Sequence, residues 1–232
     1  ASEATVPCSR LFGQPPLRRE QPGGLLTRIE APVRKRALAE RKAGRTAVTR
    51  PVPIARWDFD GNLNDSVGGL HGTAHGSARV ADGHLLLDGK SHVSTRPLAR
   101  PLKARTLEAW VRLSNRTQRG GGVISLQTLN GTTFDAIVYG EREPGRWMAG
   151  SNGFTRTVSF SGPEETAADR QVVHVAIVYA ADGMITGYRN GQLYGRSYRS
   201  RGPINFAAGS AQLLFGLRHS PPGGNRYLTA AI

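Results

Sequence analysis

One stretch of the chain carries many side-chain oxygens at close spacing. Ca²⁺ binds six to eight oxygen ligands, so carboxylates and amides clustered in a loop are candidate calcium ligands. No Glu stands at the twelfth loop position, which excludes an EF-hand. The alternative is a turn in which Asp and Asn side chains accept hydrogen bonds from nearby backbone amides. The candidate ligands are Asp58, Asp60, Asn62, Asn64 and Asp65.

A second group of residues combines positive charge, aromatic rings and amides. A sugar site needs an aromatic platform for the apolar face of the sugar and planar polar groups for its hydroxyls. Arginines outnumber acids in this group, so an acidic polysaccharide or an anionic partner domain is the expected ligand. Trp147 could equally fill the core, and Arg156 could satisfy buried carbonyls. The candidates are Arg142, Arg146, Trp147, Ser151, Asn152, Phe154, Arg156, His219 and Asn225, with Tyr188 and Arg189 as candidate neighbours.

Other sequence features argue against several kinds of chemistry. His71 and His75 have the spacing of a zinc site on a helix, but the glycines around them oppose a helix. No GxSxG, Walker loop or GxGxxG after a strand occurs, so acyl transfer, nucleotide binding and hydride transfer lack support. Cys8 is the single cysteine, which excludes an internal disulfide framework and a multi-cysteine zinc site.

The charge of the chain is unevenly distributed. Lys and Arg number 31 against 17 Asp and Glu. Residues 1–52 hold 11 basic and four acidic residues, whereas the excess over 53–232 is dilute. No basic groove interleaved with aromatic residues is present, so nucleic acid is not an expected partner. The longest apolar run, 175–181, is seven residues, and a membrane span needs about 20.

The composition divides the chain in two. Residues 1–52 contain many prolines and few apolar clusters, which predicts a basic, partly disordered linker with a short helix over 30–43. Residues 53–232 predict one folded domain. The first residue is Ala and no signal peptide is legible, so the chain is expected to be a fragment of a longer protein.

Short apolar runs separated by Asp-Gly and Asn-Gly pairs follow residue 54. This pattern is typical of antiparallel strands joined by tight turns. It predicts an all-β jelly-roll sandwich of two sheets with five or six strands each, and no helix of three turns. The run 172–179 is expected to be a central strand covered on both faces, with His174 buried in the core. The predicted strands are 54–59, 84–87, 105–113, 123–129, 133–139, 154–160, 172–179, 184–189 and 212–217.

Several short motifs, in order, resemble a concanavalin A-like, laminin-G-like (LamG) jelly-roll domain over about 54–232. They are WDFDG at 57–61, Asp65-Ser66, Gly72-Thr73, LLLDG at 85–89, TLEAWV at 106–111 and DGMITGYRNG at 182–191. FDAIVYG at 134–140, RWMAGSNGF at 146–154 and RHSPPGGNR at 218–226 resemble a bacterial version found in large multidomain proteins with cytochrome-c-like domains. That family usually ends in a further strand, so the domain is expected to lack its last strand.

The resemblance implies a non-catalytic module that binds carbohydrate, often with a structural calcium ion, in an extracytoplasmic protein (periplasmic, cell-surface or secreted). Because the superfamily includes glucanases, a pair of carboxylates across a glycosidic bond must be considered. The pairs Glu141/Glu143 and Glu164/Glu165 are expected in solvated loops, and ExDxxE is absent, so no enzyme is predicted. The alternative function is a structural or protein-protein interaction domain that positions its neighbours and binds no small ligand.

Overall fold

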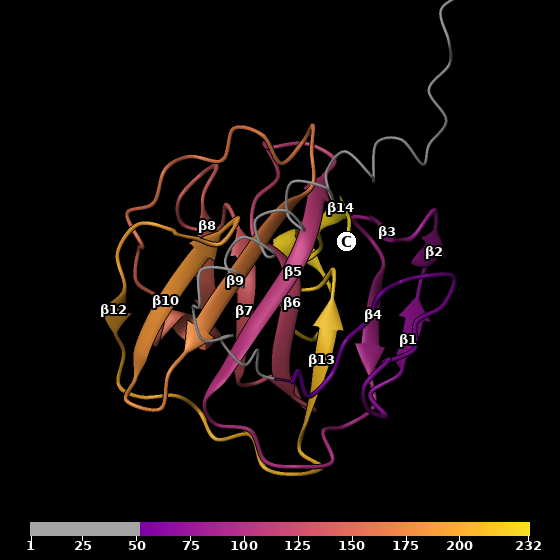
Figure 1. Ribbon diagram of the computed structural model, residues 1–232, viewed down its shortest axis with the longest axis horizontal. Coiled ribbons are helices and arrows are strands. Elements are labelled where there is room, and N and C mark those ends of the chain that lie inside the picture. Colours follow the sequence, from indigo (N-terminus) through magenta and orange to yellow (C-terminus); the bar gives the residue numbers. More distant parts are fainter. Residues whose placement is uncertain (1–51) are drawn as a thin grey trace, which may run out of the picture. The chain divides into compact units, whose positions relative to one another are not determined.

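The computed structural model describes residues 52–232, of which Pro53–Ile232 form one unit. The predicted linker and the predicted helix over 30–43 lie outside the described residues. Strands β1 to β14 form two antiparallel sheets that face each other (Figure 1). This all-β sandwich confirms the predicted fold class. The six-stranded sheet has the expected size, and the eight-stranded sheet is larger than expected.

The six-stranded sheet has the order β1-β4-β13-β6-β7-β8. Segments from both ends of the domain therefore meet in one sheet, because β13 inserts between β4 and β6. The strands are β1 (Gly72–His75), β4 (His92–Thr95), β13 (Ala211–Phe215), β6 (Gly121–Thr128), β7 (Phe134–Tyr139) and β8 (Trp147–Ser151).

The eight-stranded sheet has the order β11-β10-β9-β5-β14-β3-β2, with β12 paired to β10. Its longest strand, β5, lies between β9 and the short β14. The strands are β11 (Gln192–Leu193), β10 (Met184–Arg189), β9 (Val173–Tyr179), β5 (Arg105–Leu113), β14 (Thr229–Ala231), β3 (His84–Asp88), β2 (Arg79–Ala81) and β12 (Tyr198–Arg199).

The main core fills the space between the two sheets. In β5, residues alternate between buried and exposed along the whole strand, because successive side chains point to opposite faces. Leu107 and Val111 of β5 belong to the same buried cluster as Leu126 of β6 and Ile137 of β7. The sandwich is therefore held by apolar contact between the inner faces of the two sheets.

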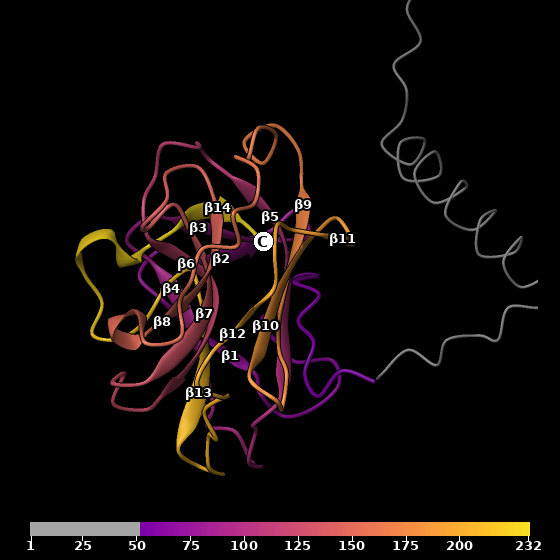
Figure 2. The same ribbon diagram turned by 90° about the vertical axis from the view of Figure 1, so that its left-hand side faces the viewer.

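The outer face of the six-stranded sheet is also covered, at β6 and β7. Phe134, Ala136 and Val138 form a second buried cluster there. The chain that follows β13 runs over these strands, and Ser125 Oγ donates a hydrogen bond of 3.0 Å to the Leu217 carbonyl. Two 3₁₀ turns, η1 (Asn152–Phe154) and η2 (Gly224–Arg226), also lie on this outer side (Figure 2). Four of the predicted sugar-binding residues, Arg142, Asn152, Phe154 and His219, lie on this outer side.

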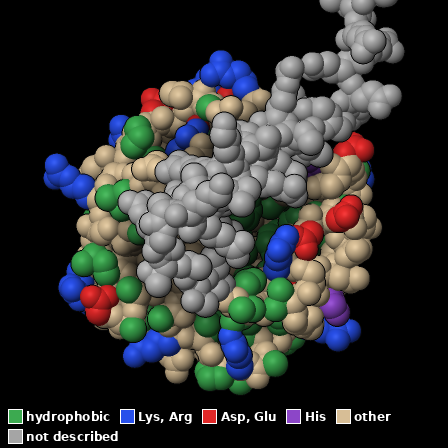
Figure 3. All heavy atoms as spheres, viewed as in Figure 1, with side chains coloured by type: hydrophobic (Ala, Val, Ile, Leu, Met, Phe, Trp, Pro, Cys, Tyr) green, Lys and Arg blue, Asp and Glu red, His purple; other side chains and the backbone are tan. Residues whose placement is uncertain are grey.

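The helical content of residues 52–232 is confined to these two turns, as the sequence predicts. Neither turn has the length or the apolar composition of a membrane-crossing helix. Lys and Arg side chains are dispersed over the visible face of the domain and form no single basic patch there (Figure 3).

Two predicted strands are wrong. Residues 54–59 form a loop with one isolated bridge, Trp57 to Asp65, and Phe59 has a positive φ of 52°. Residues 154–160 also form a loop, because Gly153 and Phe154 adopt positive φ angles of 54° and 56° that end the extended backbone after β8. Both segments have strand-like composition but a backbone that turns.

His174 is not a core histidine. It faces outward from β9, because it pairs in register with the outward Trp110 of β5. The side chain is partly exposed and its Nε2 lies 3.3 Å from the Glu108 carboxylate. Strand β9 is central in its sheet, as predicted, but only its inner face is fully covered.

Candidate functional site

The candidate calcium ligands form a hydrogen-bonded turn. Asp65 accepts bonds from the backbone N–H groups of Arg56 (2.9 Å), Val67 (3.0 Å) and Leu70 (3.1 Å). Burial acts to raise the pKa of Asp65, but the backbone N–H donors outweigh it and hold the pKa below its usual value. The Asp65 carboxylate thus stabilises the local backbone.

The other members of that group do not complete a metal site. Asp58 binds the Arg56 guanidinium at 2.6 Å and Ser66 Oγ at 2.9 Å. Asn62 Oδ1 accepts a bond from the backbone of Asn64, and Asp60 is exposed. Within residues 52–232, no group of three or more His, Cys, Asp or Glu side chains is placed to hold a metal ion. This arrangement fits the Asx-turn alternative, and the calcium site stays a prediction.

Trp147 lies in the sandwich core. Its side chain is only 2% exposed, packs 4.9 Å from the Tyr139 ring and donates a hydrogen bond of 2.9 Å from Nε1 to Glu165. Burial acts to raise the pKa of Glu165, but bonds from Arg189 and Trp147 outweigh it and hold the pKa at about 2. Trp147 therefore presents no face to a ligand, and Arg189 supports the core.

The same contacts correct the prediction for Glu165. It is 1% exposed and so does not lie in a solvated loop. Its neighbour Glu164 is exposed, as expected. In the other pair, Glu141 pairs with Arg218, and Glu143 lies 3.6 Å from Arg146.

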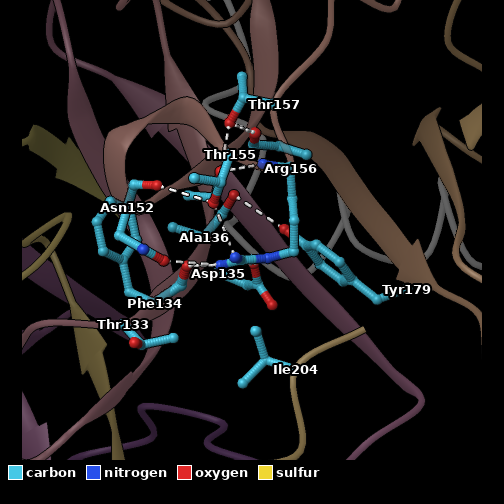
Figure 4. Close-up of polar contacts among 12 residues, drawn as sticks. Thr133, Phe134, Asp135, Ala136, Asn152, Thr155, Arg156, Thr157, Tyr179 and Ile204 are labelled. Carbon is cyan, nitrogen blue, oxygen red and sulfur yellow. Dashed lines mark hydrogen bonds and ion pairs between the residues drawn. The ribbon is translucent and has the colours of Figure 1, made fainter. Parts of the chain in front are cut away.

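Arg156 belongs to a buried ionic cluster between the sheets. Its Nε donates a bond of 3.0 Å to Asp135 of β7, and its Nη2 bonds the Phe134 carbonyl at 2.9 Å (Figure 4). Arg105 of β5 contacts the other Asp135 oxygen, so two guanidinium groups share one carboxylate. Burial lowers the pKa of Arg105 to about 10 and also lowers that of Arg156. Of the predicted roles of Arg156, satisfying buried carbonyls is the one that these contacts support.

The remaining candidates meet at the outer side of the six-stranded sheet. The Arg142 guanidinium lies 5.0 Å from the centre of the Phe154 ring, which is 39% exposed. Asn152 accepts a bond from Arg156, which in turn bonds the Phe134 carbonyl. The His219 ring stacks on the Phe134 ring at 4.5 Å. We call Arg142, Asn152, Phe154 and His219 the η1 surface.

A hydrogen bond fixes the tautomer of His219. Its Nδ1 lies 2.8 Å from the Ser220 carbonyl, which can only accept, so Nδ1 carries the proton and Nε2 is an acceptor. Burial lowers the pKa of His219, so the imidazole is neutral near pH 7. The η1 surface thus combines an aromatic ring, a cation, an amide and a neutral imidazole.

The other predicted candidates have separate contacts. Ser151 is buried and bonds Thr157 at 2.9 Å. Asn225 accepts a bond of 3.2 Å from Arg218, and Tyr188 lies on β10 of the other sheet. Asp135 was missed by sequence reasoning. An acidic residue within the apolar run FDAIVY was the signal that could have indicated a buried ion pair.

Residues 87–232 match the family model of the concanavalin A-like lectin/glucanases superfamily (Laminin_G_3). The chain belongs to this family. No curated protein matches the sequence.

Several solved structures are similar to this chain in fold. Domain 4 of AbnA, an extracellular arabinanase of family GH43 from Geobacillus stearothermophilus solved with arabinotriose, is 17% identical. That match covers 76% of this chain and 89% of the AbnA domain, with a TM-score of 0.55. The carbohydrate binding module CBM66 from Bacillus subtilis matches with 12% identity, coverage of 69% and 90%, and a TM-score of 0.42. The Emp47p carbohydrate recognition domain matches with 12% identity, coverage of 81% and 96%, and a TM-score of 0.43.

Proposed function

We propose that this domain is a non-catalytic module that binds polysaccharide through the η1 surface. The observation that carries the proposal is the exposed Phe154 ring, which shares the turn η1 with Asn152, on the side of the sheet where the His219 imidazole stacks on Phe134. A ring of this kind covers the apolar face of a sugar, while the amide and imidazole bond its hydroxyls. The arabinotriose bound to the structurally similar AbnA domain is consistent with this class of ligand.

Three of the four candidate catalytic carboxylates have internal partners, which supports a non-catalytic role. A glycosidase needs one carboxylic acid and one carboxylate free to act on the glycosidic bond. Glu141 is paired with Arg218, Glu143 lies beside Arg146, and Glu165 is fixed by Arg189 and Trp147. Each of these side chains already serves an internal contact.

Binding of the full chain to a glycan array, before and after Phe154→Ala, tests the proposal. Phe154 is exposed, so its truncation should leave the melting temperature within a few degrees of wild type and lower affinity for the recognised glycans at least tenfold. Leu193→Ala is the matched control, because it removes an exposed apolar side chain from β11 in the other sheet. Equal binding by Phe154→Ala and wild type, or an array without hits, would contradict the proposal and favour a protein-interaction domain.

A further inference from the structure

Four residues in register form a row across the eight-stranded sheet. Arg79 of β2 pairs with Leu86 of β3, Leu86 with Ala231 of β14, and Ala231 with Arg112 of β5. Paired residues in antiparallel strands point to the same face. Leu85 and the residue after Leu86 are buried in the core, so this row faces outward.

The row is the floor of a hollow of about 380 Å³. The smallest side chain of the row, Ala231, lies in the middle, and an arginine stands at each end. Three strand spacings separate the two arginines, so their Cα atoms are about 14 Å apart. Ser114, Asp88 and Asp169 line the same hollow. We call Arg79, Arg112, Asp88 and Asp169 the sheet trough.

The two arginines are available for a ligand. Both are exposed, and within residues 52–232 neither guanidinium has an ion-pair partner. A guanidinium offers a planar fork of donors that binds a carboxylate with two parallel hydrogen bonds. Acidic groups on a ligand can therefore bind at both ends of the trough.

The two carboxylates of the trough are fixed and ionised. Asp88 accepts bonds from Ser77, Ser91 (2.7 Å) and the backbone of Lys90 (2.9 Å), and these bonds lower its pKa. Asp169 pairs with Arg116 at 3.0 Å, which lowers the pKa of Asp169. An ionised carboxylate accepts hydrogen bonds from hydroxyl groups, which an oligosaccharide supplies and a poly-glutamate peptide does not. The trough is thus suited to a ligand that carries both acidic groups and hydroxyls.

An aromatic platform adjoins the trough on β5. Trp110 stands two residues before Arg112 on the same outward face and is 58% exposed. Its ring lies 4.5 Å from the His174 ring, and His174 is held by Glu108. The indole is therefore positioned by its neighbours with much of its surface open, as a platform for a sugar ring requires.

We propose that the outer face of the eight-stranded sheet is a second binding site, separate from the η1 surface, for a uronate-containing oligosaccharide. Arg79 and Arg112 bind the sugar carboxylates, Asp88 and Asp169 accept hydroxyl hydrogen bonds, and an adjoining sugar ring stacks on Trp110. This site does not depend on the η1 surface, because the two lie on different sheets.

Isothermal titration of the full chain with three probes tests the second site: oligogalacturonate, oligoglucuronate and oligomannuronate. We expect wild type to bind at least one probe, and to bind its carboxyl-reduced, neutral form at least tenfold more weakly. The double variant Arg79→Gln/Arg112→Gln and the variant Trp110→Ala should each weaken binding at least tenfold. Phe154→Ala should leave this affinity unchanged, which separates the second site from the η1 surface.

The matched control is Arg100→Gln paired with Arg201→Gln, which removes the same charge from two exposed loop arginines outside the trough. This variant should bind the uronate probe as wild type does. The proposal is overturned if none of the three probes binds, if the control loses as much affinity as the trough variant, or if the trough variant binds like wild type. Equal competition by a poly-glutamate peptide would instead assign the trough to acidic protein segments and would also overturn it.

Discussion

Trp147 and Phe154 lie close together in the sequence but have opposite environments. Trp147 is on the inner face of β8, with its indole N–H bonded to a buried carboxylate. Phe154 follows Gly153 at a positive φ, which turns its ring outward beside Arg142. The sequence shows aromatic residues near arginines in both cases. The local backbone decides which ring can meet a ligand.

The candidate site could be predicted only in part for this reason. The predicted residues Arg142, Asn152, Phe154 and His219 lie on the outer side of the six-stranded sheet, and their role as a binding site stays a prediction. Core packing removed the others from that surface: Ser151 and Arg156 serve the interior. The partners that bury them, such as Asp135, come from strands distant in the sequence and leave no local pattern.

His92 should make the stability of the domain depend on pH. Burial, and to a smaller extent the nearby His75, lower the pKa of His92 from 6.5 to about 4. Its ring stacks on His75 at 4.4 Å and lies 6.1 Å from the Tyr227 ring. Between pH 6.5 and 4 the unfolded chain binds a proton that the native state excludes, so the free energy of unfolding decreases as the pH falls.

Thermal melts at intervals from pH 7 to pH 4 measure this effect. The melting temperature of wild type should decrease over the interval, and His92→Gln should show a shallower decrease whatever its absolute stability. The control is His84→Gln, which changes the first residue of β3 and should keep the wild-type slope. Parallel curves for wild type and His92→Gln would contradict the assignment.

The elements differ in how much their own sequence determines them. The predicted bounds of β5 and β10 agree with the structure, because both alternate clearly and end at turn residues. Strands β2, β11, β12 and β14 have two or three residues and were not predicted. Such short strands exist because a partner strand aligns them, and periodicity over so few residues carries no signal.

Gly122 shows how closely two elements must approach on the covered face. A Cβ at this position would lie 2.5 Å from Arg218 Cα and 2.6 Å from its backbone nitrogen. These are backbone atoms, so β6 and the segment after β13 would have to separate. We expect Gly122→Ala to lower the free energy of unfolding by about 1–3 kcal/mol.

Urea unfolding checks this expectation by comparing the free energy of unfolding of Gly122→Ala with that of Gly69→Ala. A Cβ at Gly69 meets no atom within 4 Å, and its φ is not in the left-handed region, so this control should be close to wild type. Equal stability of the two variants would show that the segment after β13 does not press on β6 in solution.

At the scale of the whole molecule, the positive charge has two different roles. On the face that Figure 3 shows, Lys and Arg side chains are dispersed. In the interior, Arg105 and Arg156 are buried and share Asp135, so two cations depend on one anion. Arg105 also lies 4.9 Å from the Tyr179 ring and 4.8 Å from the Phe206 ring. This cluster connects β5 of one sheet to β7 of the other.

Asp135→Asn should therefore destabilise the entire sandwich. The variant keeps the size of the side chain but leaves two buried guanidinium groups without a carboxylate, and removing one partner of a buried pair typically costs about 3–5 kcal/mol. Asp182→Asn is the control, because Asp182 pairs with Arg199 at 3.2 Å on the open surface, where such a pair contributes little. Because the cluster joins both sheets, chemical unfolding followed by tryptophan fluorescence and by far-ultraviolet circular dichroism should shift together in Asp135→Asn. Asp182→Asn should unfold like wild type, and a similar midpoint for the two variants would mean that apolar packing alone holds the sheets together.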